Sequence, residues 1–319
     1  TPCMSVSQFN FPTRIVFGCA SVQSLPDEVK GSGFSKPLIV TDRNLVGLKF
    51  FVEIIQTMTR AGLDCLVSDC TLGNPLGSHV SEGLGAYKKH GADLIIAVGG
   101  GAALDVAKAI AVVANNEGDI LEYDALGASP RQIINDPAPL IAVPTTSGTG
   151  SEVGRAAVIS DDLTHQKKII FHPGLMPHLV IADPELTCGI PKAITAATGF
   201  DALTHNIEAY LSKGFHPMCD AIALEGMAMI FENLQRACEQ PQDLRAREQM
   251  MAASLMGAVA FQKGLGVTHS CAHALSTVHD MHHGLANAVM LEACLRFNGE
   301  TEGGRLKKMA QAIGLGSAA

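Results

Sequence analysis

The stretch DLIIAVGGGAALDVAKAI, residues 93–110, joins a short apolar run to three glycines and then to a segment with helical spacing. An uninterrupted apolar run of this length is typical of a strand that is buried on both faces of a parallel sheet. Bare glycine backbone can approach an anion closely, and the first free N–H groups of the following helix point toward it. The stretch therefore predicts a strand, a phosphate-binding loop and a helix, although three glycines can also form only a tight turn.

The same alternation of apolar runs and helical segments continues on both sides of this stretch. Strands are predicted at residues 14–18, 37–41, 64–68, 93–98, 139–143 and 178–182. Helices are predicted near residues 45–61, 77–90 and 102–115. Strands that alternate with helices indicate a parallel sheet with crossover helices. We therefore predict an α/β dinucleotide-binding domain over residues 1–187, with a parallel sheet.

The second part of the chain has a different composition. From Pro191 onward, Ala, Leu, Met, Glu, Gln and Lys recur at helical spacing, with breaks at SKGFHP and EQPQD. This pattern predicts an all-α domain over residues 188–319, with the boundary between 184 and 191.

The bulk composition limits the class of partner. The 319 residues carry a net charge of −8 without a basic run, which argues against nucleic acid or an anionic membrane surface. No uninterrupted apolar stretch reaches the roughly 18 to 20 residues of a membrane span. The nine cysteines are odd in number and contain no C-x-x-C pair, which favours reduced thiols and a cytoplasmic protein. A small molecule is the expected partner.

Two further features follow predicted strands. VPTTSGTGSE, residues 143–152, presents the hydroxyls of Thr145, Thr146 and Thr149 and free backbone amides to a polar ligand, although turns favour the same residue types. Asp42 ends the strand PLIVTD, where a carboxylate can accept both hydrogen bonds of an adenosine ribose and repel a 2′-phosphate. A single carboxylate at a strand end can also be only a turn residue.

Histidines are concentrated in GVTHSCAHALSTVHDMHHG, residues 266–284, which holds five of the 12 in the chain. Imidazole is the commonest protein ligand of divalent transition metals, but a helix that carries ordinary hydrogen-bonded histidines is the simpler alternative. His269 and His273 are four residues apart and share a helix face. One continuous helix would hold His269 about 21 Å from His283, so a shared ion requires a break in the chain between them.

A second ligand pair lies in GFDALTHNIEAY, residues 199–210. On a helix, Asp201 and His205 project from one face about 6 Å apart and can hold one ion together. Asp-x-x-x-His is common by chance, so this pair alone is weak support for a metal site.

Five segments together resemble the iron-dependent (group III) alcohol dehydrogenases, in the same order and over nearly the whole chain. They are GGGAALDVAK (99–108), PTTSGTGSE (144–152), ADPELT (182–187), GFDALTHNIEAY (199–210) and the H-x-x-x-H that is followed by HHG (269–284). The resemblance implies an N-terminal dinucleotide-binding domain and a C-terminal helical metal domain, an architecture similar to that of dehydroquinate synthase. It also implies hydride transfer between an alcohol, or its aldehyde or ketone, and NAD, with NADP as an alternative, in a cleft between the domains.

The resemblance also assigns site residues. The implied metal ligands are Asp201, His205, His269 and His283, for Fe²⁺ or alternatively Zn²⁺. His273 is implied beside the nicotinamide and the metal, where an imidazole can relay a proton, so His269 and His273 are the predicted catalytic residues. The implied cofactor-binding residues are Asp42, Asn74, Gly99, Gly100, Gly101, Asp105, Thr145, Thr146, Thr149 and Lys168.

The sequence departs from the family pattern at three places. Ala102 replaces the usual serine after the glycines and removes a hydroxyl donor, but the backbone amides remain. His282 stands where many members have proline, and it is an alternative ligand beside His283. Family members continue through further helices, so we expect part of the helical domain to lie outside this sequence. His279 and His282 receive no role from the resemblance.

Four other functions remain as alternatives. Three are relatives on the same architecture: a zinc glycerol dehydrogenase, a hydroxyacid-oxoacid transhydrogenase and a cyclising sugar-phosphate synthase. The fourth, a metal-storing protein without catalysis, leaves both strand-end loops unexplained. We expect a homodimer or larger homo-oligomer, and the particular alcohol is not encoded in these motifs.

Overall fold

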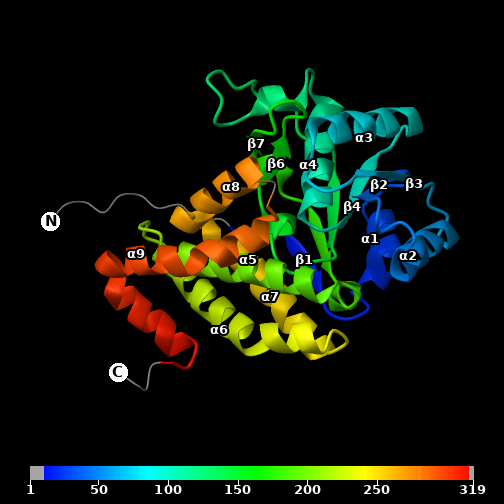
Figure 1. Cartoon of the computed structure of the whole chain (residues 1–319). Coiled ribbons are helices and arrows are strands. Elements are labelled where there is room, and N and C mark those ends of the chain that lie inside the picture. The colour runs from blue at the N-terminus through cyan, green and yellow to red at the C-terminus, as the bar shows by residue number, and fades with distance from the viewer. Residues whose placement is uncertain (1–10, 280, 316–319) are drawn as a thin grey trace. The chain divides into compact units, whose positions relative to one another are not determined.

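The computed structural model describes residues 11–279 and 281–315, and its contacts divide the chain into two units (Figure 1). The sheet unit comprises Thr13–Thr146 and Ser151–Gly189. The helical unit comprises Ser147–Gly150, the chain from Ile190 onward and the described residues before Thr13. The loop that follows residue 144 therefore contributes to both units.

The sheet unit is built on six parallel strands in the order β1-β8-β5-β4-β2-β3. The strands are β1 (Arg14–Phe17), β2 (Pro37–Asp42), β3 (Leu66–Thr71), β4 (Leu94–Gly99), β5 (Leu140–Pro144) and β8 (Leu179–Ala182). The helices are α1 (Leu25–Gly31), α2 (Lys49–Arg60), α3 (Gly77–His90) and α4 (Gly101–Asn115). The predicted α/β class with a parallel sheet is confirmed.

Helices cover both faces of the sheet, which explains the continuous apolar runs in the central strands. Alternate residues of β4, such as Ile96 and Val98, pack in one cluster with Phe51 and Met58 of α2. The intervening residues face the opposite side, where α4 contacts β2, β4 and β5. Every residue of β4 and β5 is buried. Burial on two faces removes the alternation of polar and apolar residues that a half-exposed strand shows.

The strand order brings the predicted cofactor segments to one edge. Strand β4 lies between β2 and β5, while the chain passes from β2 outward to β3 before it returns to β4. A reversal of this kind leaves a crevice at the carboxyl ends of the strands, where open α/β sheets bind ligands. In this unit, those ends carry Asp42 as the last residue of β2, Gly99 as the last residue of β4 with Gly100 after it, and Thr145 after β5.

Two predicted boundaries are wrong. The strand predicted at 64–68 is β3 at Leu66–Thr71, because its pairing with β2 continues to Thr71 across an irregularity in register. The helix predicted at 45–61 is α2 at Lys49–Arg60. Its start is delayed because Asp42 accepts a hydrogen bond from the Asn44 backbone and the chain turns there.

The sequence patterns also missed a second, two-stranded antiparallel sheet. It pairs β6 (Ala156–Ser160) with β7 (Lys167–Phe171). Short 3₁₀ helices lie at Ser21–Ser24, Ile120–Tyr123, Ser151–Val153, Pro173–Leu175 and Pro184–Thr187.

The helical unit contains α5 (Lys192–Leu211), α6 (Pro217–Glu239), α7 (Leu244–Ala260), α8 (Val267–His279) and α9 (His283–Ala312), with a 3₁₀ turn at Phe261–Lys263. Helix α5 contacts α6, α7, α8 and α9, so it is the central helix of the unit (Figure 1). Its side chains from Thr204 to Leu211 are all buried, including the polar ones. Polar groups on a fully buried helix require partners, which directs attention to α5.

Among the described residues, no single helix has both the length and the apolar composition of a membrane span. One bent helix pair, Leu244–Lys263 with Val267–His279, meets both criteria together, but its helices meet at 105°. None of the eight described cysteines forms a disulfide.

Candidate metal centre and cofactor site

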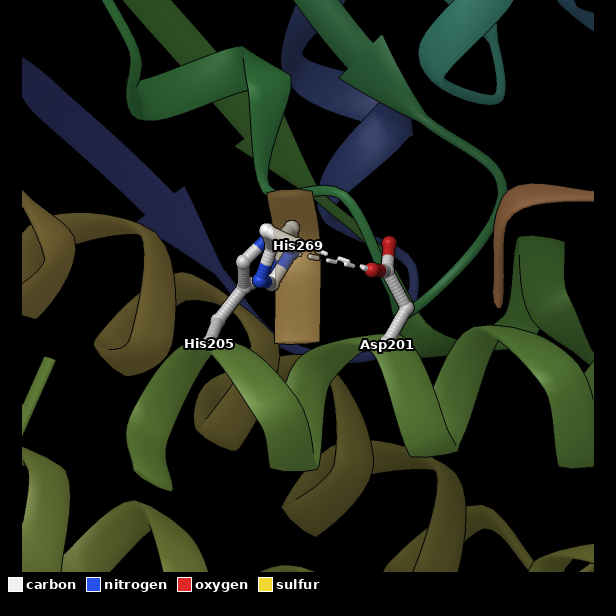
Figure 2. A group of neighbouring side chains, drawn as sticks. All are labelled: Asp201, His205 and His269. Atoms are coloured by element: carbon white, nitrogen blue, oxygen red, sulfur yellow. Dashed lines mark ion pairs between the residues drawn. The ribbon is translucent and has the colours of Figure 1, made fainter. Parts of the chain in front are cut away.

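Four predicted metal ligands converge in the helical unit. Asp201 and His205 lie one turn apart on α5, and His269 lies on α8. Figure 2 shows Asp201 and His205 projecting from the same side of α5 toward His269. These three side chains are almost fully buried, at 3%, 6% and 5% exposure, whereas the side chain of His283 is 27% exposed. Helix α8 ends at His279 and α9 begins at His283, which supplies the predicted break in the chain.

The distances between donor atoms fit one divalent ion. The Oδ1 atom of Asp201 lies 3.8 Å from Nε2 of His205, 3.7 Å from Nε2 of His269 and 3.5 Å from Nε2 of His283. Ligands about 2.1 Å from a tetrahedral ion are about 3.4 Å from one another. The donor set of one carboxylate and three imidazoles also suits Fe²⁺ or Zn²⁺. The donor atoms of Asp201, His205 and His269 all lie within 4.8 Å of one another, so these three side chains match a metal site in spacing and chemistry, and His283 approaches the same carboxylate oxygen.

Glu208 supports this centre from the far side of His269. Its Oε2 atom lies 2.7 Å from Nδ1 of His269, so this ring can present Nε2 to the ligand cluster. The carboxylate also accepts backbone hydrogen bonds from Gly266, Thr268 and His269 at the start of α8. A side chain at Gly266 would contact the carboxylate at 2.8 Å. A carboxylate that orients a ligating imidazole is a recurrent feature of metal sites.

The electrostatics favour an ionised carboxylate beside a neutral imidazole. Burial disfavours the charged form of Asp201, but the imidazoles of His205, His269 and His283 outweigh it and lower its pKa below the usual range. Burial lowers the pKa of His205 to about 4 against the opposing charge of Asp201. Burial also acts to lower the pKa of His269, but Asp201 and Glu208 reverse the effect and raise it to about 9, so without an ion this ring keeps a proton that metal binding has to displace. His205 is therefore unprotonated at neutral pH, as a ligand must be.

Of the remaining histidines of residues 266–284, His273 lies beside the cluster and the other two are exposed. The ring of His273 lies 5.2 Å from that of His283 and 6.5 Å from that of His269, measured between ring centroids. Its place beside the cluster is compatible with the predicted proton relay. His279 and His282 are exposed, and His282 directly precedes α9.

The predicted phosphate loop lies at the carboxyl end of β4. Helix α4 begins at Gly101, and no side chain caps its first turn. Its first N–H groups are thus available to an anion. A side chain at Gly99 would approach Ala103 to 2.7 Å, and one at Gly100 would approach Thr146 to 3.2 Å. The tight packing of this loop explains why glycines occupy it.

The other predicted cofactor residues are distributed over several elements. Asp42 ends β2, and Asn74 is exposed in the connection between β3 and α3. Thr145 donates its backbone N–H to Gly99, which ties the two loops together. Thr149 belongs to the helical unit. Lys168 of β7 lies 3.2 Å from the carboxylate of Asp124.

Asp105 has partners inside the sheet unit. Its two carboxylate oxygens accept hydrogen bonds from the Ser151 hydroxyl at 2.6 Å and the Val158 backbone at 3.0 Å. One turn later, the fully buried Lys108 donates to the carbonyls of Ser151, Gly154 and Ala156. Asp105 and Lys108 therefore fix the chain that follows the threonine loop, and contact between Asp105 and a cofactor stays a prediction.

Glu152 is buried, as Lys108 is, and it leads to a pH-dependent prediction. Burial raises the pKa of Glu152 from 4.5 to about 7, although Lys108 opposes the shift. Between these pH values the folded chain keeps a proton that the unfolded chain has released, so stability falls as pH rises. The loss, complete above pH 7, is at most about 3 kcal/mol.

We expect Glu152→Gln to remove this pH dependence because an amide does not ionise. Urea unfolding should give similar stabilities for the variant and the parent at pH 5 and a more stable variant at pH 8. A variant that is equally destabilised at both pH values would contradict the assignment.

Two residues of the centre, Glu208 and Asn287, were not predicted from the sequence. Glu208 could have been found, because Asp201, His205 and Glu208 follow the i, i+4, i+7 spacing of one helix face. Asn287 lies one turn after His283 on α9, and its Nδ2 atom donates to Asp201 Oδ1 at 2.7 Å. The four-residue spacing from His283 to Asn287 is a weaker signal, because only the resemblance implies that His283 is a ligand.

Two models of one protein family together match most of the chain. The model of the family "Iron-containing alcohol dehydrogenase" matches residues 12–184, and that of its C-terminal domain matches residues 195–319. A 4-hydroxybutyrate dehydrogenase of Cupriavidus necator is 42% identical over 90% of this chain and 76% of its own length. An NAD-dependent methanol dehydrogenase of Bacillus methanolicus is 35% identical over 97% of this chain and 80% of its own.

Solved structures agree with the sequence matches. A 1,3-propanediol oxidoreductase superposes with a TM-score of 0.91 at 35% identity, covering 97% of this chain and 80% of that one. A sulfoacetaldehyde reductase of Bifidobacterium kashiwanohense, solved in complex with NAD⁺, gives 0.90 at 31% identity over 98% and 82%. The two family matches span both units, and the four donor side chains lie within the second. The chain therefore belongs to the iron-containing alcohol dehydrogenase family.

Proposed function

We propose that the chain is an NAD-linked alcohol dehydrogenase that interconverts short-chain alcohols with their aldehydes or ketones. The observation that carries the proposal is the convergence of three imidazoles on Asp201 Oδ1, in a chain of this family. Relatives are named for 4-hydroxybutyrate, methanol and 1,3-propanediol, which are all small primary alcohols. This range supports a small primary alcohol, with or without a distant polar group, as the substrate class.

Each part of the site has a stated task in this proposal. Asp201, His205, His269 and His283 hold a divalent ion, with Fe²⁺ proposed and Zn²⁺ as the alternative. When bound, the ion polarises the substrate oxygen and the nicotinamide exchanges the hydride. Glu208 orients the His269 ring, and His273 passes the hydroxyl proton toward solvent. Gly99, Gly100 and the first turn of α4 bind the cofactor phosphates through backbone amides.

The preference for NAD is assigned to Asp42. Its carboxylate lies at the end of β2, beside the reversal in strand order, where it can accept hydrogen bonds from ribose hydroxyls and repel a 2′-phosphate. Repulsion between like charges near a protein surface amounts to about 1 to 4 kcal/mol. We expect Asp42→Ala to reduce the preference for NAD⁺ over NADP⁺, measured as a ratio of kcat/KM values, at least about tenfold.

Asp27→Ala is the matched control, because Asp27 is exposed in the first turn of α1 and lies at no strand end. It removes the same charge and should leave the ratio of kcat/KM values unchanged. Equal ratios in the parent and Asp42→Ala would refute the role of Asp42.

The proposed activity is tested with anaerobically purified protein loaded with Fe²⁺ or Zn²⁺. Reduction of NAD⁺ is measured with methanol, ethanol, 1,3-propanediol, 4-hydroxybutanoate and glycerol, and NADH binding is measured by fluorescence. Turnover of small primary alcohols supports the proposal. Turnover of glycerol alone favours a glycerol dehydrogenase, and oxidation of a hydroxy acid only with an added oxoacid favours a transhydrogenase. Metal binding without NADH binding favours a storage protein.

A cytoplasmic location and a homo-oligomeric state are parts of the same proposal. The eight cysteines within residues 11–279 and 281–315, which form no disulfide, support a reducing compartment. Light scattering of the purified protein measures the mass in solution, and a monomer at micromolar concentration would contradict the proposed oligomer.

A further inference from the structure

We propose that Asn287 is a positioning residue of the metal centre, which holds the Asp201 carboxylate in place for the ion and favours inward-directed lone pairs on two of the imidazoles. The inference rests on the proposed function, because it requires that Asp201 and the three histidines bind a metal. It concerns a residue of α9 that no sequence motif singled out.

The Asn287 amide lies among the proposed ligand atoms. Asn287 is fully buried, and its Nδ2 atom lies 2.7 Å from Asp201 Oδ1, the atom nearest to all three imidazoles. The same nitrogen lies 3.3 Å from Nε2 of His283 and 3.4 Å from Nε2 of His269. One amide nitrogen thus lies within hydrogen-bond distance of three of the four proposed ligand atoms.

The amide nitrogen of Asn287 also has the chemistry that suits metal-binding forms of its neighbours. An amide nitrogen only donates hydrogen bonds, so it is complementary to acceptors: a carboxylate oxygen and Nε2 atoms that carry lone pairs. These are the forms that bind a metal. For His269, the Glu208 carboxylate lies 2.7 Å from Nδ1 on the opposite edge of the ring. Asn287 and Glu208 therefore act on one imidazole from two sides, and both favour a proton on Nδ1 and a lone pair on Nε2.

The oxygen end of the Asn287 amide indicates which way the amide is turned. The Oδ1 atom of Asn287 is buried and has no hydrogen-bond partner among the described residues. An unsatisfied buried carbonyl costs about 1 to 3 kcal/mol. The opposite orientation would put this oxygen about as close to the Asp201 carboxylate as the nitrogen is now, which two acceptors disfavour. The amide thus keeps its nitrogen toward the ligands although its oxygen remains unsatisfied.

The test compares Asn287→Ala with Asn206→Ala. Asn206 is also fully buried and also has an unsatisfied Oδ1, but its Nδ2 donates to the backbone carbonyls of Ala202 and Ala253. It directly follows His205 in sequence, yet both hydrogen bonds of its Nδ2 atom go to backbone carbonyls and not to a ligand side chain. The pair therefore separates loss of a buried asparagine from loss of a donor to the centre.

The readouts are the dissociation constants of Co²⁺ and Zn²⁺, measured by chelator competition, and the melting temperature of the metal-free protein. We expect Asn287→Ala to weaken metal binding about 10- to 100-fold, the usual effect of removing a group that orients a ligand. Without metal, the melting temperature of Asn287→Ala should fall less than the melting temperature of Asn206→Ala. The metal dissociation constants of Asn206→Ala should stay within about threefold of the parent values.

Asn287→Leu provides a second variant that fills the volume and removes the donor, in case the alanine variant is too unstable to purify. It should show the same loss of metal affinity and a changed Co²⁺ absorption spectrum. Parent-like dissociation constants in a folded Asn287 variant would overturn the inference. A parent protein that binds no metal would instead overturn the proposed function, so the two failures are distinguishable.

Discussion

Replacement of His269 by alanine is expected to abolish bound metal and alcohol oxidation together. The variant loses one of four donors, and the Glu208 carboxylate loses the imidazole that it orients at 2.7 Å. Loss of a group that only orients a ligand weakens metal binding about 10- to 100-fold, so loss of the ligand itself should exceed 100-fold. Lewis-acid polarisation contributes several kcal/mol to such reactions, which corresponds to at least about a 1,000-fold loss of kcat.

His273→Ala is the matched control, because His273 lies one turn later on α8 and its ring is next to the cluster. We expect it to retain the metal, measured by elemental analysis, and to lower kcat about 100-fold or more, as for loss of a proton-transfer group. Full retention of the metal by His269→Ala would remove His269 from the ligand set. Loss of the metal in His273→Ala would instead make His273 a ligand and end its assignment as a relay.

The central strands were predictable because burial on two faces leaves a direct trace in the sequence. Residues 93–98 and 139–143 are apolar runs bounded by glycine or proline, and they correspond to β4 and β5 within one residue. A strand that is buried on both faces is specified by its own composition. The helix α4 was equally clear, since the glycines set its start.

The β6–β7 hairpin could not be recognised in the same way. Strand β7 begins with Lys167 and Lys168, and Phe171 at its end is 51% exposed, so its composition is not that of a buried strand. Its place is set by pairing with β6, which is itself held by hydrogen bonds to Asp105 and Lys108. The signal that was available is the turn, where Asp161 accepts hydrogen bonds from the Leu163 and Thr164 backbones.

Some residues of the candidate metal centre could be predicted from their spacing in the sequence, and others could not. The pair Asp201 and His205 could be derived from spacing, because both lie on one helix face. The convergence of His269 and His283 on them depends on a break between two helices, and the pattern of residues shows only that such a break is allowed. Asn287 illustrates the limit, because an asparagine inside a helix is usually a surface residue and only tertiary packing brings it to the ligands.

Gly284→Ala is expected to destabilise the fold and to weaken metal binding. Gly284 is the second residue of α9, and a Cβ atom there would lie 2.2 Å from the carbonyl oxygen of Ala197 in α5. The obstructing atoms are backbone, so α9 itself has to move. Overpacking of this kind costs about 1 to 3 kcal/mol. The displacement acts on His283 directly and on Asn287 one turn later, so we expect lower affinity for Zn²⁺ as well.

Gly303→Ala in the same helix is the matched control, because a Cβ atom there has no neighbour within 4 Å. Alanine is favoured over glycine inside a helix by about 1 kcal/mol, so this variant should melt at the same temperature as the parent or higher. It should bind Zn²⁺ as the parent does, since Gly303 is more than five turns from His283 at about 3.6 residues per turn. If Gly284→Ala bound Zn²⁺ and melted like the parent, the close contact between α5 and α9 would not be what sets the position of His283.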